Sequence, residues 1–588
     1  MKPIIDPRRG DLEDDASSPK RRSLLSLAGS LVSELSFPKL IAAWAVLLVA
    51  PCAVLGLSPL IASAWIGKIS GKIASPYAGI GPLLILGVLL VVGWFAGRSL
   101  FRVVERSFWA LNSLLVEPFY AVSREGLQQL VDQLLSVKTS KTRRGRLRAM
   151  TAAAAGMIVC ALALLVLVLA WPHSRWVGNA SDLISPLLLV PVVAANSVVL
   201  LAGYVAGSAL VWAIGDATMS QPRDFHGFDL GSHVGRRWRV AHLSDLHVVG
   251  ERYGFRIESG RSGPRGNERL KRLLAQLDAL HATEPLDLVL ITGDMTDAGR
   301  SAEWAEFLDV LALHPRLAER VVMLPGNHDL NVVDRENPAR LDLPTSPTKR
   351  LRQMRALSAL AELQGTRVRV VDQPAGHVGA RLADVIEPYR AQMMQFADAG
   401  ALMLSLALAD LWASVFPMIV PPDPDDGLGI ILLNSNAETH FSFTNALGLI
   451  SAEQIKRIEI VTAQYPRACW IIALHHHPVE YPRTAPALSV RIGTTLINGS
   501  WFVRRLRPMA GRIALMHGHR HIDWIGECAG LLIISAPSPV MDATDDLSTY
   551  FYIQTLALAP HGRLRLLSPQ KIAVPGQDRA ETQQVLEE

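Results

Sequence analysis

The segment "RIALMHGHRHID" at residues 512–523 places histidines at alternate positions, His517, His519 and His521. Side chains two residues apart on an extended segment point the same way, so His519 and His521 can present imidazoles to one point. Gly518 has no Cβ atom, which lets the backbone turn sharply or approach a bound group closely. The spacing is typical of a metal site, although a polar loop would also explain this segment taken alone.

Four further clusters of metal-ligand residue types follow short apolar runs, such as "RWRVAHLSDLH" and "RVVMLPGNHD". They are Asp245 and His247; Asp294 and Asp297; Asn327, His328 and Asp329; and His475, His476 and His477. Carboxylate, amide and imidazole donors together suffice for two divalent cations, and one carboxylate can bridge both. A turn or a polar loop would explain any single cluster, but five clusters that each end a β-like run favour one shared site.

In this order the clusters resemble the signature of the calcineurin-like metallophosphoesterases, D-x-H, G-D, G-N-H-D or E, a later histidine, and G-H-x-H. The resemblance covers residues 236–560, and "LSDLH" and "LHHHP" are most similar to the class III cyclic nucleotide phosphodiesterase branch. It implies two divalent metal ions, manganese, iron or zinc. By position, it implies the metal ligands Asp245, His247 and His521 for one ion, Asp294 as the bridge, and Asn327, His476 and His519 for the other. The triple histidine leaves His475 open as an alternative to His476.

The resemblance also implies a mechanism. Two cations about 3.5–4 Å apart lower the pKa of a shared water, so that a bridging hydroxide attacks the phosphoester. His328, oriented by Asp329, is expected to be the catalytic group that protonates the leaving oxygen or stabilises charge on phosphorus. The sequence departs from the cyclic nucleotide branch at "NSN", Asn434–Asn436, where relatives often have Asp-Ser, and this leaves the substrate open.

The strand-like and helix-like patterns around these residues predict an α/β fold class. The family resemblance implies two mixed β-sheets sandwiched between helices. Helical spacing in "NERLKRLLAQLDAL" and "SAEWAEFLDVLAL" predicts connectors, and Ser451 with Gln454 predicts a capping box at a helix start. We expect a metallophosphoesterase domain at 222–572 and a disordered tail at 573–588. An insertion at about 331–428 is either a surface elaboration or a lid that shapes the substrate site.

Uncharged runs in the first third predict a transmembrane region. They lie at 40–66, 78–96, 150–171 and 183–214, and each is long enough to cross a bilayer core, which needs roughly 20 residues. Four transmembrane helices are therefore expected within 40–215, and Pro186 and Pro191 predict that the last run begins with a bent or interfacial part. The basic loop at 98–148 predicts that the amino-terminal segment 1–39 and the domain after 222 are cytoplasmic, at an inner or plasma membrane.

The whole chain of 588 residues has a formal net charge of +5 and four cysteines. The cysteines suggest no disulfide framework, as expected in a reducing compartment, and the first residues lack the layout of a cleavable signal peptide. Basic residues do not interleave with aromatic ones, so no nucleic acid partner is expected. The expected partners are a lipid bilayer and a phosphoester, either a small molecule or a lipid headgroup; the oligomeric state stays open.

Three hypotheses follow from these patterns. The first is a membrane-anchored phosphodiesterase that acts on a cytoplasmic phosphoester, with cyclic nucleotides as the most suggestive class. The second is a hydrolase of a lipid-linked phosphate or pyrophosphate with the same metal centre. The third is an inactive metal-binding sensor or scaffold in the membrane.

Overall fold

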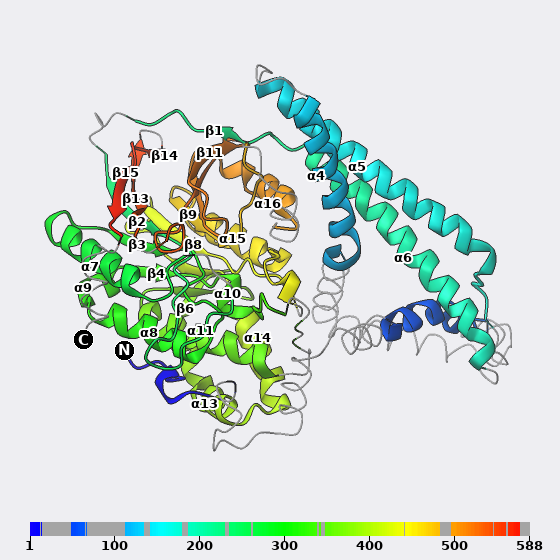
Figure 1. Ribbon diagram of the computed structural model, residues 1–588, viewed down its shortest axis with the longest axis horizontal. Coiled ribbons are helices and arrows are strands. Elements are labelled where there is room, and N and C mark those ends of the chain that lie inside the picture. Colours follow the sequence, from blue (N-terminus) through cyan, green and yellow to red (C-terminus); the bar gives the residue numbers. More distant parts are fainter. Residues whose placement is uncertain are drawn as a thin grey trace. The chain divides into compact units, whose positions relative to one another are not determined.

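The computed structural model describes residues 1–11, 13, 49–64, 66–67, 112–134, 141–178, 186–229, 235–259, 263–337, 340, 342, 347–439, 442–482, 496–544, 546–559 and 562–576. Contacts divide the chain into two compact units (Figure 1). One unit consists mainly of Ser220 to the carboxyl-terminal part and includes the amino-terminal segment. The other consists mainly of residues between Ser36 and Met219.

The second unit is helical in its described part. Its labelled helices are α4 (Glu117–Leu134), α5 (Lys141–Ala170) and α6 (Pro186–Ala217), with a π-helical turn, η2 (Asn112–Val116), before α4. α5 and α6 pack through small residues: a Cβ atom placed on Gly156 would lie 2.2 Å from the Cβ of Ala213. Close approach of helix backbones through small residues is common in membrane helix pairs.

Two helices in the described part are long and apolar enough to cross a membrane, Gly145–His173 and Leu187–Ala217. They correspond to the third and fourth predicted runs. The first run is described only from residue 49, as a shorter apolar helix at Val49–Ala64, and the run at 78–96 lies outside the described residues. The predicted four-helix region is therefore not shown. In the last run one helix begins at Pro186 and continues through Pro191, and the predicted bend or interfacial position of its first part stays a prediction.

The unit that begins at Ser220 contains two mixed sheets, as predicted. The larger has the strand order β1 (Arg223–Asp224), β11 (Trp524–Cys528), β12 (Leu531–Ser535), β10 (Ile513–His517), β9 (Cys469–Ala473), β8 (Leu428–Leu432), β7 (Met418–Val420), β5 (Arg369–Asp372) and β6 (His377–Arg381). The smaller has the order β14 (Arg563–Leu566), β13 (Thr549–Ala559), β2 (Arg237–Leu243), β3 (Leu288–Ile291) and β4 (Val321–Met323), and β15 (Gln570–Val574) pairs with β13. β15 shows that residues 573 and 574 of the predicted tail belong to this sheet; residues 577–588 lie outside the described part.

Helices surround these sheets (Figure 1). They are α7 (Glu268–Thr283), α8 (Ser301–Ala312), α9 (Pro315–Ala318), α10 (Asn327–Leu330), α11 (Pro347–Gln364), α12 (Leu382–Ile386), α13 (Arg390–Ala399), α14 (Leu402–Val415), α15 (Ala452–Gln464) and α16 (Gly499–Leu506). The two helical patterns predicted as connectors form α7 and α8. Ser451 caps α15 by accepting from the Gln454 amide, but the Gln454 side chain bonds the Asn434 backbone, so only half of the predicted capping box forms.

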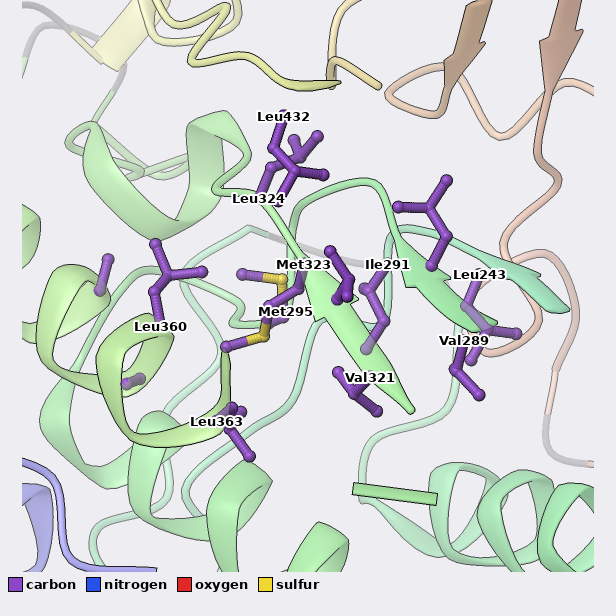
Figure 2. Close-up of a cluster of buried hydrophobic side chains, with 14 of the residues drawn as sticks. Leu243, Val289, Ile291, Met295, Val321, Met323, Leu324, Leu360, Leu363 and Leu432 are labelled. Carbon is purple, nitrogen blue, oxygen red and sulfur yellow. The ribbon is translucent and has the colours of Figure 1, made fainter. Parts of the chain in front are cut away.

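Parallel strands at the centre of each sheet hold the core. β2, β3 and β4 are parallel neighbours, as are β8, β9, β10 and β12, and their apolar residues are buried. Strands covered on both faces need such continuous apolar runs, which explains "LVLI" and "CWIIA". Figure 2 shows Met323 of β4 between Ile291 of β3 on one side and Leu360 of α11 on the other.

The segment 331–428 belongs to this core. It contains α11, whose Met354, Leu357 and Leu360 are fully buried, and β5, β6 and β7, which extend the larger sheet. Of the two alternatives, a surface elaboration does not describe α11 and these three strands, and a lid stays a prediction. The helix and the three strands are part of the fold that supports the site.

The amino-terminal residues pack on the same unit. The Ile5 amide donates to Ser358 Oγ at 2.8 Å, and Asp11 pairs with the guanidinium of Arg355 in α11. Both Asp11 and Arg355 are almost fully buried. This contact joins residues that are more than 340 positions apart in the chain.

Candidate metal centre

Five strands deliver the predicted ligands at their carboxyl ends. Asp245 and His247 follow β2, Asp294 follows β3, and Asn327 begins α10 after β4. His475 follows β9, and His519 and His521 follow β10. β2, β3 and β4 run in parallel, and so do β9 and β10, so within each sheet the ligands emerge at one edge.

The backbone is strained at these residues. Six non-glycine residues in the described part have positive φ, and five of them are predicted ligands: Asp245 (56°), His247 (46°), Asp294 (52°), His519 (75°) and His521 (52°). A non-glycine residue in the left-handed region costs on the order of 1–3 kcal/mol, and such residues cluster at functional sites. The concentration of strain at five ligand positions is therefore evidence for function that does not depend on residue type.

The first donor group consists of Asp245, His247 and His521, whose ligand atoms all lie within 4.8 Å of one another. His521 Nε2 lies 3.4 Å from Asp245 Oδ1, and its Nδ1 lies 3.1 Å from Asp542 Oδ1. A carboxylate on the second ring nitrogen fixes the tautomer and orientation of a metal-binding histidine. Asp542 therefore holds the His521 ring with Nε2 toward Asp245.

The second donor group consists of Asp294, His475 and His519, with Asn327 beside it. His475 Nε2 lies 3.1 Å from Asp294 Oδ2, 3.0 Å from Asn327 Oδ1 and 3.1 Å from His519 Nδ1. Two ligand atoms about 2.1 Å from one cation at right angles lie about 3 Å apart. His475 Nδ1 donates to the Thr292 carbonyl at 2.8 Å, which leaves Nε2 as the nitrogen that faces this group.

The structure places His475, rather than His476, in the second group. His476 Nδ1 lies 2.9 Å from Ser435 Oγ, and no hydrogen bond reaches its buried Nε2. Ser435, the middle residue of "NSN", also accepts from the backbone amides of His475 and His476. The geometry therefore favours His475, the alternative that the triple histidine left open, because His475 and not His476 belongs to a donor group.

Alanine variants separate these two histidines. We expect His475→Ala to weaken binding of the second metal ion by at least about 10-fold, and His476→Ala to reduce it less, through loss of the Ser435 contact. Isothermal titration of the metal-free protein with Mn²⁺ measures both. Equal affinity of His475→Ala and the unchanged protein would show that His475 is not a ligand.

His328 and Asp329 have different surroundings from those predicted. His328 Nδ1 donates to the Asp297 carbonyl at 2.7 Å, while its backbone amide donates to Asp294 Oδ1 at 2.8 Å. The Asp329 carboxylate instead accepts from Thr296 Oγ1 (2.6 Å), the Thr296 amide (2.9 Å) and the Gly326 amide (2.8 Å). The prediction that Asp329 orients His328 is thus wrong. Asp329 joins the loops that follow β3 and β4.

The charges of the buried donor residues indicate which kind of ligand they fit. Asp245 and Asp294 are fully buried, and within the described part of the chain no lysine or arginine nitrogen lies within 4 Å of either carboxylate. Burial opposes ionisation, but the charges of His521 and His475 hold the pKa of Asp245 at about 2, and those of His475 and His328 hold the pKa of Asp294 well below its usual value. Burial alone would lower the pKa of His475, yet Asp294 and Asp245 raise it to about 9. Buried carboxylates require positive charge, so the donor set fits divalent cations.

Glycine is required beside the ligands. A Cβ atom on Gly518 would lie 1.7 Å from Ser244 Oγ and 2.6 Å from Asp245 Oδ2, and Gly293 combines φ +102° with a clash against His475 Nδ1 at 2.4 Å. The absence of a side chain lets the ligand loops approach one another. His517, the first histidine of the opening segment, is buried, with Nδ1 3.2 Å from the Gly518 carbonyl, and lies outside both donor groups.

Comparison with known proteins finds a family model that covers part of this centre. Residues 239–390 match the family model described as calcineurin-like phosphoesterase. The chain contains a calcineurin-like metallophosphoesterase domain. This family uses a dinuclear metal centre, and the clustered aspartates and histidines suit it.

Solved structures with detectable similarity include a dimetal phosphatase from Danio rerio, with 13% sequence identity, a TM-score of 0.32, and coverage of 58% of this chain and 99% of that one. A second is the NAD nucleotidase of Haemophilus influenzae, with 12% identity, a TM-score of 0.30, and coverage of 58% of this chain and 51% of that one. No curated protein matches the sequence.

Sequence reasoning missed several residues that hold the ligands. Asp542 belongs to no motif and lies 21 residues beyond His521, and Ser435 stood out only as a departure from relatives. The carbonyls of Thr292 and Asp297, which fix the rings of His475 and His328, have no sequence signature at all. For Asp542 the available signal was a carboxylate soon after β12, the second strand beyond G-H-x-H.

Proposed function

We propose that this chain is a membrane-anchored, dinuclear-metal phosphoesterase that hydrolyses a phosphodiester, with a cyclic nucleotide as the first candidate substrate. The observation that carries the proposal is the convergence of donor atoms from five strand ends, with positive φ at five of the predicted ligands. Positive φ at the ligands and the burial of the Asp245 and Asp294 carboxylates both lower the stability of the fold. Metal binding is the function that explains both. An inactive scaffold is less well supported, because the donors and His328 are all in place.

Each group of residues has a task in hydrolysis. Two divalent cations, when bound, lower the pKa of water and neutralise phosphoryl oxygens. Asp245, His247, His521 and Asp542 would form and orient one half of their site, and Asn327, His475 and His519 the other, with Asp294 between them. His328 is only half-buried and its ring meets that of His247 edge-on at 4.5 Å, so its Nε2 side is available to a substrate.

The membrane anchor is supported by two observations. α5 and α6 are long and apolar enough to span a bilayer and pack through small residues. The amino-terminal residues before these helices and the phosphoesterase domain after them belong to one compact unit, so both must lie on one side of any membrane. The number of crossings between them is then even, which agrees with two spans or with the predicted four.

His328→Ala tests the proposed proton donor. We expect kcat to fall by roughly 100- to 10,000-fold, the usual contribution of a general acid, while the metal content stays near that of the unchanged protein. Steady-state kinetics and elemental analysis of the same sample measure both quantities. His377→Ala, on exposed β6, is the matched control. Undiminished turnover in His328→Ala would remove His328 from the mechanism.

The substrate test uses the full chain in lipid nanodiscs with Mn²⁺ added. The panel consists of cyclic AMP, bis(p-nitrophenyl) phosphate and a lipid-linked pyrophosphate in the disc. Hydrolysis of a phosphodiester that disappears on chelation is the expected result. Preference for the lipid pyrophosphate would favour the second hypothesis, and inactivity towards all three despite two bound metals would favour the scaffold.

A further inference from the structure

The chain enters the phosphoesterase domain at the end of the larger sheet that is remote from the metal centre. α6 ends at Ala217 and β1 begins at Arg223, and Cys528 Sγ contacts the Ser220 carbonyl at 3.0 Å between them. Cys528 pairs with Leu531 at the amino end of β12, which runs parallel to β10. The ligands His519 and His521 follow the carboxyl end of β10. About 16 Å of strand therefore separates the attachment point from the site.

Several arginines gather at this end, which we call the tether end and define as the amino ends of β9, β10 and β12 with the start of β14. Arg512 donates to the Pro466 carbonyl next to Arg467, and the Leu564 amide donates to the Gly511 carbonyl, which brings Arg563 beside Arg512. Arg507 follows α16 three residues after Arg504. α16, β11 and β14 lie near the top of the domain in the view of Figure 1.

These arginines are not neutralised. Arg467, Arg507 and Arg563 are exposed and Arg512 is half-buried, and no described carboxylate lies within 4 Å of these four guanidinium groups. Two neighbouring acids are already paired, Glu459 with Arg505 and Glu527 with Arg223. The aspartates of the turn before β8 lie one strand farther from Ser220 than Arg467 does. The part of the tether end nearest the attachment point is therefore cationic.

From these observations we infer that the tether end rests on an anionic bilayer surface and that the metal centre opens away from it, toward soluble phosphoesters. This inference rests on the membrane anchoring proposed above. The linker Thr218–Pro222 has five residues and spans at most about 17 Å, so the tether end cannot move far from the end of α6. Exposed arginines beside such an anchor are attracted to anionic headgroups. A substrate fixed in the same bilayer would have to reach the far end of the domain.

The orientation is measured by spin labels on the full chain in nanodiscs that contain anionic lipid. In a Cys52→Ala background, Arg563→Cys labels the tether end, and Ser548→Cys labels an exposed position before β13, at the end where the site lies. With a nickel chelate on the lipid headgroups, we expect strong relaxation of the label at 563 and at least about 10-fold weaker relaxation at 548. Equal relaxation at both positions, stronger relaxation at 548, or none at 563 would each overturn the inference.

Charge reversal tests the lipid contact separately. Arg507→Glu with Arg563→Glu should reduce the relaxation of a label introduced at Arg467→Cys, whereas Arg381→Glu on distant β6 should leave it unchanged. These readouts need no turnover, so a protein that contacts lipid in this orientation but hydrolyses nothing would contradict only the proposed function. Faster hydrolysis of a lipid pyrophosphate than of bis(p-nitrophenyl) phosphate in the same disc would contradict the inferred substrate class.

Discussion

Asp294→Asn should lower kcat/KM for a phosphodiester by at least about 1,000-fold, which corresponds to roughly 4 kcal/mol of lost transition-state stabilisation. The Asp294 carboxylate contacts a histidine of each donor group: its Oδ2 lies 3.1 Å from His475 Nε2 and 3.9 Å from His247 Nε2. Asparagine keeps the shape but removes the charge that offsets two buried cations. We expect the number of tightly bound metal ions to fall from two to one or none in the same variant.

The control for this substitution is Asp384→Asn on α12, an exposed aspartate outside the site. Thermal unfolding must accompany the kinetics, because Asp294 also accepts from the His328 amide at 2.8 Å. A variant that unfolds at the usual temperature, binds two metal ions and retains its activity would refute the bridging role.

The ligand positions could be predicted because each belongs to a short block at a strand end, and the parallel arrangement of the strands brings such ends together. The choice between His475 and His476 could not, because adjacent residues after a strand point in different directions and the register depends on where β9 ends. Backbone hydrogen-bond partners could not be predicted either, because any residue type can supply a carbonyl such as that of Asp297, which fixes His328. Apolar runs predicted helices that could span a membrane, but their composition could not show that α6 continues through Pro191.

The role of the amino-terminal residues could not be predicted either, since no local pattern marks a contact across more than 300 positions. Asp11 and Glu13 approach the buried guanidinium groups of Arg352 and Arg355, with Glu13 oxygens 2.9 Å from each. Arg355 Nη1 donates to the Gly299 carbonyl at 2.6 Å and Arg352 Nε to the Leu330 carbonyl at 2.9 Å. The Gly299 carbonyl lies in the loop that carries Asp294, and the Leu330 carbonyl lies in α10, which carries His328, so the amino-terminal acids support the site indirectly.

Asp11→Ala should therefore destabilise the phosphoesterase domain by about 3–5 kcal/mol, because it leaves the Arg355 charge buried without its two-pronged partner. We expect the unfolding temperature to fall by roughly 5–10 °C in differential scanning calorimetry of the full chain. Asp11→Ala combined with Arg355→Met should recover only part of this loss, because Arg355 also pairs with Glu13 and donates to the Gly299 carbonyl. An unchanged unfolding temperature in Asp11→Ala would show that the contact does not stabilise the fold.

Acid should weaken the same contact through Glu13. Burial alone would raise the pKa of Glu13, but the charges of Arg352 and Arg355 lower it to about 2, from an ordinary value of 4.5. A carboxyl group whose pKa is lower in the folded than in the unfolded chain stabilises the fold at pH values above its unfolded pKa. About 3 kcal/mol of the free energy of unfolding should therefore be lost as the pH falls from about 4.5 toward 2. Glu13→Gln has no charge to lose there, and its unfolding temperature should depend less on pH across this window. If the unfolding temperatures of Glu13→Gln and the unchanged protein depended on pH in the same way, the two arginines would not hold Glu13 ionised. The ion pairs of Glu13 would then not explain why the amino-terminal segment packs on α11.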